Sequence, residues 1–196
     1  MQIQDIFGDL PSVETERLVL RKVSLDDVAD QFAWTSDPLV TQFLTWGPER
    51  SPAETERSIR YILSLYAQGQ VSPWAVVLKE TGRQIGSCGF NWWSPVHRRA
   101  EISYMLNRHY WGRGFATEAV AAVIRFGFER MDLNRIEALV SPANLASRRV
   151  LEKVGMRPEG ILREAINVKG VFADHIMYSL LRREWAQAQV ARREEV

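Results

Sequence analysis

A stretch with two glycines decides the fold: residues 110–119 read Tyr-Trp-Gly-Arg-Gly-Phe-Ala-Thr-Glu-Ala. It lies between a predicted strand over 100–106 and a predicted helix over 115–131. Gly112 and Gly114 let the backbone pass close to a ligand, and the first amide groups of a helix have no partners inside that helix. Together with the helix dipole, these amides favour a bound phosphate. The alternative is a tight turn that needs glycine only for its backbone angles.

Two known phosphate-binding loops do not match this stretch. A Walker loop requires Gly-Lys followed by Ser or Thr, and the chain has no such triplet. A dinucleotide fingerprint requires a third Gly or Ala, but Thr117 stands at that position. The strand before the stretch also follows two antiparallel-looking strands instead of opening a βαβ unit. A nucleotide-binding oxidoreductase is therefore disfavoured.

Strands and helices alternate along the rest of the chain, without repeats or linkers, which favours one α/β domain. Ser51, Pro52 and Glu54 have the order of a helix start with a capping box. The expected strands are 17–22, 74–79, 84–93, 100–106, 135–140, 161–167 and 172–180, and the expected helices are 24–37, 51–68, 115–131, 144–154 and a short one after Arg182. We expect a single domain over 1–196, with a core over about 14–182 and peripheral ends at 1–13 and 183–196.

Composition excludes several classes of protein. The 196 residues include 25 Lys and Arg and 24 Asp and Glu, a net charge of +1, which argues against a general nucleic-acid binder. The single cysteine, Cys88, excludes an internal disulfide and favours a cytoplasmic location. Asp5 and Asp9 argue against a secretory signal, and no stretch approaches the roughly 20 apolar residues of a membrane span. The three widely spaced histidines predict no metal site.

Further motifs stand in a fixed order around residues 110–119. They are Glu16-Arg17-Leu18-Val19-Leu20-Arg21, Gly86-Ser87-Cys88-Gly89-Phe90, Ala100-Glu101-Ile102-Ser103-Tyr104, Asn144 to Ser147, Val150 to Met156, and Met177 to Leu181. In this order and spacing the chain resembles the GNAT N-acetyltransferase superfamily, and most closely its RimJ/RimL-like branch. The wider superfamily often has Gln or Arg where this chain has Trp111, and tryptophan there is usual in this branch.

The resemblance implies an α/β (α+β) fold with a mixed, mostly antiparallel sheet of about seven strands and helices on both faces. The strand over 100–106 is expected to splay from that over 135–140, leaving a gap for the pantetheine arm of acetyl-coenzyme A. The pyrophosphate is expected on the amides from Gly112 to Thr117. The expected cofactor-binding residues are Met105, Leu106, Trp111, Gly112, Arg113, Gly114, Phe115, Ala116, Thr117, Asn144 and Ser147.

Acetyl transfer to an amine requires a base for the ammonium proton and a group that stabilises the leaving thiolate. Glu101 is the candidate base, because it lies in a strand that reads as central, and burial raises a carboxylate pKa toward the working range. The alternative for Glu101 is a structural ion pair with Arg98, Arg99 or another cation near the end of the strand. Cys88 is expected to be a small core residue, since direct transfer needs no cysteine.

Ser147 is the candidate acid. Asn144 and Ser147 stand at the start of the predicted helix over 144–154, and their spacing alone predicts only helix capping. The resemblance implies that Asn144 contacts the pantetheine arm and that Ser147 faces the thioester sulfur.

The resemblance implies an N-acetyltransferase that moves an acetyl group from acetyl-coenzyme A to a primary amine. The acceptor is either a protein N-terminal α-amine or a small amine. The alternative is a non-catalytic sensor that binds acyl-coenzyme A. We expect neither a nucleic-acid nor a membrane partner. A homodimer through an exposed hairpin or through the final strands is a further expectation. Six acids would suit a cationic acceptor, although such charges usually only solvate helices: Asp26, Asp27, Asp30, Asp37, Glu54 and Glu56.

Overall fold

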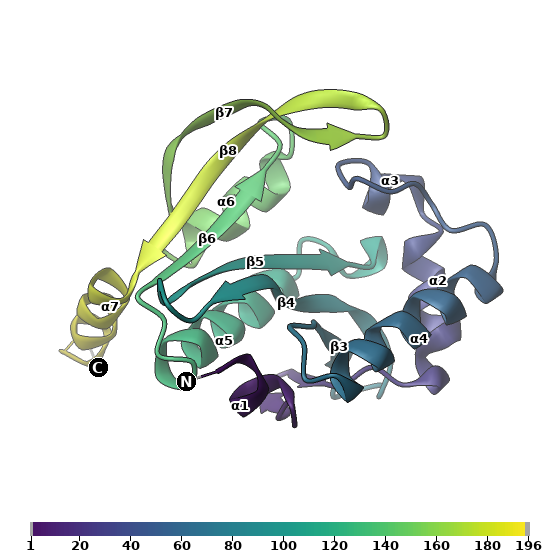
Figure 1. Ribbon diagram of the computed structural model, residues 1–196, viewed down its shortest axis with the longest axis horizontal. Coiled ribbons are helices and arrows are strands. Elements are labelled where there is room, and N and C mark those ends of the chain that lie inside the picture. The colour runs from purple at the N-terminus through teal and green to yellow at the C-terminus, as the bar shows by residue number, and fades with distance from the viewer. Residues whose placement is uncertain (1, 195–196) are drawn as a thin grey trace.

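An eight-stranded sheet forms the centre of the protein (Figure 1). The computed structural model describes residues 2–194, and side chains over 2–191. The strands are β1 Val13–Glu14, β2 Leu18–Arg21, β3 Trp74–Leu78, β4 Gln84–Ser94, β5 Arg99–Leu106, β6 Arg135–Val140, β7 Arg157–Val168 and β8 Val171–Leu181, in the order β1-β2-β3-β4-β5-β6-β8-β7. The pair β5–β6 is parallel and the other neighbouring pairs are antiparallel, which confirms the mixed sheet. The strand beyond the expected seven is the two-residue β1.

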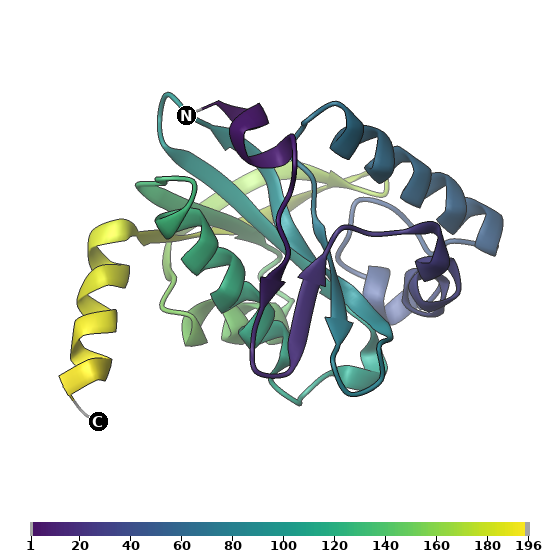
Figure 2. The ribbon, with the colours of Figure 1, turned by 90° about the horizontal axis from the view of Figure 1, so that it is seen from below.

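Helices cover both faces of the sheet, with α4 on one side and α5 on the other (Figure 2). They are α1 Ile3–Phe7, α2 Val28–Thr35, α3 Pro38–Thr41, α4 Pro52–Ala67, α5 Phe115–Glu129, α6 Leu145–Lys153 and α7 Arg182–Glu194, with short 3-10 turns η1 Leu25–Asp27 and η2 Arg108–Tyr110. Within residues 2–194, no helix combines the length and the apolar character that a membrane crossing requires.

The core lies mainly between the sheet and α5. Small side chains on the inner face of α5, such as Ala119 and Val123, are buried there, as the helical spacing predicted. A Cβ atom on Gly127 would lie 3.0 Å from side-chain atoms of Ile136, Leu133 and Phe90, so this helix packs closely against the sheet. Cys88 is also buried, as expected of a small core residue, and burial raises the pKa of its thiol.

The N-terminal segment contributes to the same core. Phe7 is fully buried, with its ring centroid 6.4 Å from that of Trp74 and 6.3 Å from that of Trp93. The indole Nε1 of Trp74 donates a hydrogen bond to Pro11 O at 2.7 Å. Residues before β1 therefore pack against the tryptophan side chains that β3 and β4 contribute to the core.

The predicted capping box at the start of α4 is wrong. Glu54 Oε2 accepts a hydrogen bond from the backbone N of Arg50 at 2.7 Å, one residue before the N-cap Ser51. A capping box forms instead at η1, where Asp27 Oδ2 accepts from Ser24 N at 2.8 Å. Sequence spacing alone does not tell whether a glutamate at this position binds the N-cap amide or the amide before it. The direction in which the chain enters the helix decides which amide the carboxylate reaches.

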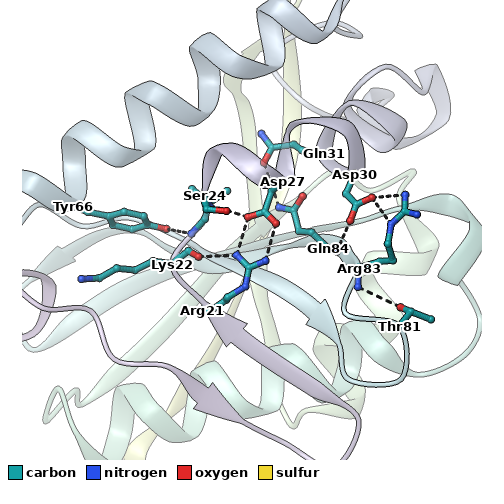
Figure 3. A network of polar contacts seen from close by, with 11 residues as sticks. Arg21, Lys22, Ser24, Asp27, Asp30, Gln31, Tyr66, Thr81, Arg83 and Gln84 are labelled. Atoms are coloured by element: carbon teal, nitrogen blue, oxygen red, sulfur yellow. Dashed lines mark hydrogen bonds and ion pairs between the residues drawn. The ribbon is translucent and has the colours of Figure 1, made fainter.

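Two acids fasten the start of α2 to the sheet (Figure 3). The guanidinium of Arg21 makes two hydrogen bonds to the buried carboxylate of Asp27, at 2.8 and 2.7 Å. Asp30 accepts hydrogen bonds from Arg83 Nε at 2.5 Å and from Gln84 N at 2.9 Å. Bidentate, charge-assisted bonds fix orientation as well as distance, so α2 is held rigidly over β2 and the β3–β4 turn.

A carboxylate on β7 makes the fold acid-sensitive. Arg135 donates two hydrogen bonds to Glu159, at 2.7 and 2.6 Å, and Ser179 donates a third at 2.6 Å. These bonds, from Arg135 first and then Ser179, lower the pKa of Glu159 from 4.5 to about 2. A carboxyl group with a lowered folded-state pKa stabilises the fold above its unfolded pKa, and that contribution is lost as pH falls toward the folded value.

We therefore expect Glu159→Gln to lower the melting temperature at neutral pH and to have a smaller effect near pH 3, within the window from about 4.5 to about 2. Thermal unfolding of both proteins across this range measures the difference. A difference that does not change with pH would show that the carboxylate charge contributes nothing.

The β7–β8 hairpin exposes several apolar side chains, among them Ile161, Val171 and Phe172. The homodimer expected through this hairpin stays a prediction.

Candidate active site

The strands β5 and β6 diverge after a short parallel contact. They pair only at three positions, from Arg99 with Arg135 to Glu101 with Glu137. Beyond these residues β5 stays paired with β4 and β6 stays paired with β8, so the two halves of the sheet separate (Figure 1). The expected splay is confirmed, and it opens the sheet where the end of β5 meets the glycine-containing turn.

A cleft of about 600 Å³ lies at this divergence. Its walls are the end of β5, the turn at 110–114, the first turns of α5 and α6, and residues 39–44. The predicted cofactor residues that line it are Met105, Leu106, Trp111, Gly112, Gly114, Phe115, Ala116, Thr117, Asn144 and Ser147. Arg113 is not among the lining residues, because its guanidinium lies over the rings of Tyr110 and Phe115, 5.6 and 5.0 Å from their centroids.

The glycine-containing turn has the backbone shape that glycine favours. Gly112 and Gly114 have φ angles of +73° and +82°, in the left-handed region, and Gly114 is the N-cap of α5. The amide of Glu118 donates to Gly114 O at 3.0 Å, which closes the first helical turn. The amides of residues 115–117 therefore have no partner inside the helix, and they stand at the wall of the cleft.

An acid inside this first turn is neutralised by residues of the turn between β1 and β2, far away in the sequence. Glu118 Oε1 accepts hydrogen bonds from Thr15 Oγ1 at 2.6 Å and from Arg17 N at 2.9 Å, and Glu118 Oε2 accepts from Arg17 Nε at 2.7 Å. Burial opposes the effect, but these hydrogen bonds lower the pKa of Glu118. Arg17 also donates to Arg113 O at 3.1 Å. Arg17 thus removes a charge that would repel an anion and holds the turn in place.

Trp111 ties the turn to β5, since its indole Nε1 donates to Leu106 O at 2.7 Å. Trp111, where the wider superfamily often has Gln or Arg, thus has a structural role at the cleft. It fixes the end of β5 relative to the amides of α5.

Two hydroxyl groups meet inside the cleft. Tyr104 Oη lies 2.7 Å from Ser147 Oγ, and it also lies 3.1 Å from Ser147 O. Burial raises the pKa of Tyr104, while its hydrogen bond with Ser147 acts in the opposite direction, so the phenol stays protonated as a donor. Asn144 caps α6, with its Oδ1 accepting from Ser147 N at 3.1 Å, as spacing alone predicted. Sequence reasoning missed Tyr104, whose signal was a polar group on an otherwise apolar strand face.

Glu101 lies apart from this pair, on the opposite face of β5 from Tyr104. It is half-buried and lines neither this cleft nor the second cavity described below. Its Oε1 accepts a hydrogen bond from Asn91 Nδ2 at 2.6 Å, and Asn91 Oδ1 accepts from Ser103 Oγ at 2.6 Å. Ser103 and Met105 follow on the same face, about 7 and 13 Å further along the strand. A polar chain therefore runs from Glu101 toward the divergence.

The ion pair considered for Glu101 does not form with either arginine. Arg98 pairs with Asp132 at 2.7 Å, and Arg99 lies 3.9 Å from Glu137. The contact of Glu101 described above is thus with a neutral amide, that of Asn91.

A second cavity, of about 630 Å³, lies between the sheet and the helices α2 and α4. Trp34 and Thr35 of α2, residues 46–49, and one face of α4 form its walls, and Ser87 and Met105 line it from the sheet. Met105 also lines the first cleft, so the two cavities meet at this residue of β5. Among the described residues, no group of three or more His, Cys, Asp or Glu side chains is arranged to hold a metal ion.

Comparison with known proteins identifies the class. A family model described as "Acetyltransferase (GNAT) domain" matches residues 17–157. "Uncharacterized N-acetyltransferase p20" of Bacillus licheniformis is 41% identical over 177 residues, which cover 90% of this chain and 99% of that protein. The "[Ribosomal protein uS5]-alanine N-acetyltransferase" of Escherichia coli K12 is 24% identical over 92% of this chain and 98% of its own. A solved structure titled RimL, a ribosomal L7/L12 α-N-protein acetyltransferase in complex with coenzyme A, has a TM-score of 0.76 at 22% identity and covers 87% of this chain and 98% of its own.

The protein is thus an acetyl-coenzyme A-dependent acyltransferase. The chain belongs to the GNAT acetyltransferase family, and the relatives above agree with the RimJ/RimL-like branch that the motif order predicted.

Proposed function

We propose that this protein transfers the acetyl group directly to a primary amine, either the N-terminal α-amine of a protein or a small amine. The observation that carries the proposal is the cleft between β5 and β6, which joins free helix amides at one end to the Tyr104–Ser147 hydroxyl pair. The ribosomal-protein substrate in the name of the uS5-alanine relative supports a protein amine as the acceptor.

The chain fits the two ends of acetyl-coenzyme A. Gly112 and Gly114 leave room for a close approach, and the amides of residues 115–117, at the positive end of α5, suit a pyrophosphate. The diverging edge of β5 at Met105 and Leu106 suits the amide groups of a pantetheine arm. Asn144 and Ser147 face the same cleft from α6.

The reacting centre needs groups that hold or remove protons. Acetyl-coenzyme A supplies a thioester whose carbonyl carbon is open to attack by a neutral amine. The hydroxyl of Ser147, which shares a hydrogen bond with the phenol of Tyr104, is the proposed donor to the leaving thiolate. Glu101 is the proposed base, and it acts through water because it lies outside both cavities.

In this proposal the acceptor amine binds in the second cavity and the coenzyme binds in the first cleft. The second cavity opens on the face of the sheet opposite α5 and reaches Met105, where the first cleft begins. An amine in the second cavity and a thioester in the first would thus meet across β5 without competing for space.

The test is acetyl-coenzyme A turnover, followed as free thiol release, with a panel of N-terminal peptides and small amines. We expect turnover that depends on the amine. Binding of coenzyme without turnover on any amine would favour the non-catalytic sensor. Failure to bind any acyl-coenzyme A would contradict the assignment of the cleft.

Within this assay, Ser147→Ala and Tyr104→Phe are each expected to lower kcat about 10-fold, the size of one lost hydrogen bond to the reacting atoms. The double variant is expected to lose little more than either single one, because the two hydroxyls act as a unit. Coenzyme affinity, measured by calorimetry, is the control. If the two losses of kcat multiply in the double variant, the two hydroxyls act independently, and their proposed shared role is contradicted.

A further inference from the structure

One carboxylate in the second cavity is held by hydroxyl groups alone among the side chains that the structure describes. Glu49 accepts hydrogen bonds from Thr35 Oγ1 at 2.5 Å, from Ser58 Oγ at 2.7 Å, and from Thr55 Oγ1. Thr35 and Thr55 are buried, with 2% and 0% of their surface exposed, so the carboxylate is fixed from two helices. Hydroxyl donors orient a carboxylate but leave its negative charge in place. In the part of the chain that the structure describes, no cation pairs with Glu49.

The six acids that the sequence analysis considered for binding a cationic acceptor differ from Glu49 in their ion pairs. Five of them form ion pairs within the protein: Asp27 with Arg21, Asp30 with Arg83, Asp37 with Arg108, Glu54 with Arg57 and Glu56 with Arg60. Their charges are therefore partly or wholly balanced. Glu49, which was not among the six, is the carboxylate that lines the second cavity without such a partner.

The rest of the cavity suits a positively charged ligand. Trp34, Trp46 and Tyr61 line it with aromatic surface, and aromatic faces attract cations. Arg57 opposes a cation, but it is 70% exposed and lies 4.0 Å from Glu54.

We propose that Glu49 selects acceptors that carry a second cationic group in addition to the reacting amine. The reacting amine lies near Met105, where the two cavities meet, and the second cation lies between Glu49 and the aromatic walls. This inference rests on the proposed amine acetylation. The shared chemistry has two sources, a small diamine or a peptide whose early residues carry a basic side chain.

The test compares acceptors that differ only in the second charge. α,ω-Diaminoalkanes are compared with monoamines of the same length, and N-terminal peptides with lysine at the second position are compared with the norleucine versions. We expect the dicationic acceptors to have the lower KM. Glu49→Gln keeps an oxygen for the hydroxyl donors and removes the charge, so it is expected to raise KM for dicationic acceptors about 10- to 30-fold and leave the monoamine KM unchanged. If only the diamine and monoamine differ in KM, the acceptor is a small diamine. If only the lysine and norleucine peptides differ, the acceptor is a peptide with an early basic residue.

Two variants of α4 serve as controls. Glu56→Gln removes an acid outside the cavity, paired with Arg60, and is expected to change neither KM. Arg57→Gln removes the opposing cation from the cavity wall and is expected to lower KM for dicationic acceptors.

If Glu49→Gln impairs monoamines and diamines equally, Glu49 is a structural residue and the inference is overturned. If the wild type shows no preference for a second charge, the inference fails while amine acetylation stands. If no amine is acetylated, the proposed function itself fails.

Discussion

Glu101→Gln is expected to lower kcat by about 100- to 1,000-fold, within the range that a general base contributes, while coenzyme binding stays unchanged. The substitution keeps an oxygen that can accept the hydrogen bond from Asn91 Nδ2, so the local structure of β4 and β5 is preserved. It removes the carboxylate that we propose as the acceptor of the ammonium proton. Turnover with a saturating amine, together with calorimetric coenzyme affinity, separates the loss of chemistry from the loss of binding.

Asn91→Ala provides the matched comparison for this site. It leaves the carboxylate in place but removes the contact that orients it, so a smaller loss of kcat is expected. A melting temperature close to that of the wild type is required of both variants. Turnover that survives in Glu101→Gln would assign the polar chain from Glu101 to Ser103 a structural role, and the base would have to be sought among groups that line the cavities.

Local features of the fold could be predicted from the sequence. The strand over 135–140 coincides with β6, and the helix after Gly114 begins at Phe115, because alternation and helix-start signals act over a few residues. The glycine-containing turn was found for the same reason: its chemistry depends on two glycines and the helix that follows. The two-residue β1 has too little pattern to be recognised.

The contacts that complete the site could not be predicted in this way. Arg17 and Glu118 are 101 residues apart, and Tyr104 and Ser147 are 43 apart, so no local pattern links them. The position of Glu101 outside the cavities depends on where the sheet diverges. Glu49 was missed because its hydroxyl partners come from α2 and α4, and they meet only in three dimensions.

Gly114→Val is expected to weaken coenzyme binding by about 100-fold. Gly114 has a φ of +82°, and a β-branched residue in this left-handed region costs about 1–3 kcal/mol of strain. An added Cβ would lie 3.4 Å from Arg17 Nη2, an ordinary contact, so the positive φ is by itself a reason for strain at this position. The backbone is expected to relax by turning the amides of residues 115–117 away from the cleft. Losing one or two charge-assisted hydrogen bonds to a phosphate accounts for the expected loss of affinity.

The control for Gly114→Val is a glycine with the same backbone strain and no connection to the cleft. Gly82, in the β3–β4 turn, has a φ of +67°, and nothing lies within 4 Å of an added Cβ. Gly82→Val is therefore expected to lower the melting temperature by a similar amount and to leave coenzyme affinity intact. Calorimetric titration of both variants with coenzyme A decides the question. If the two lose affinity equally, the loss at Gly114 reports general destabilisation. If Gly114→Val alone loses affinity, the turn binds the coenzyme through the backbone that its glycines shape.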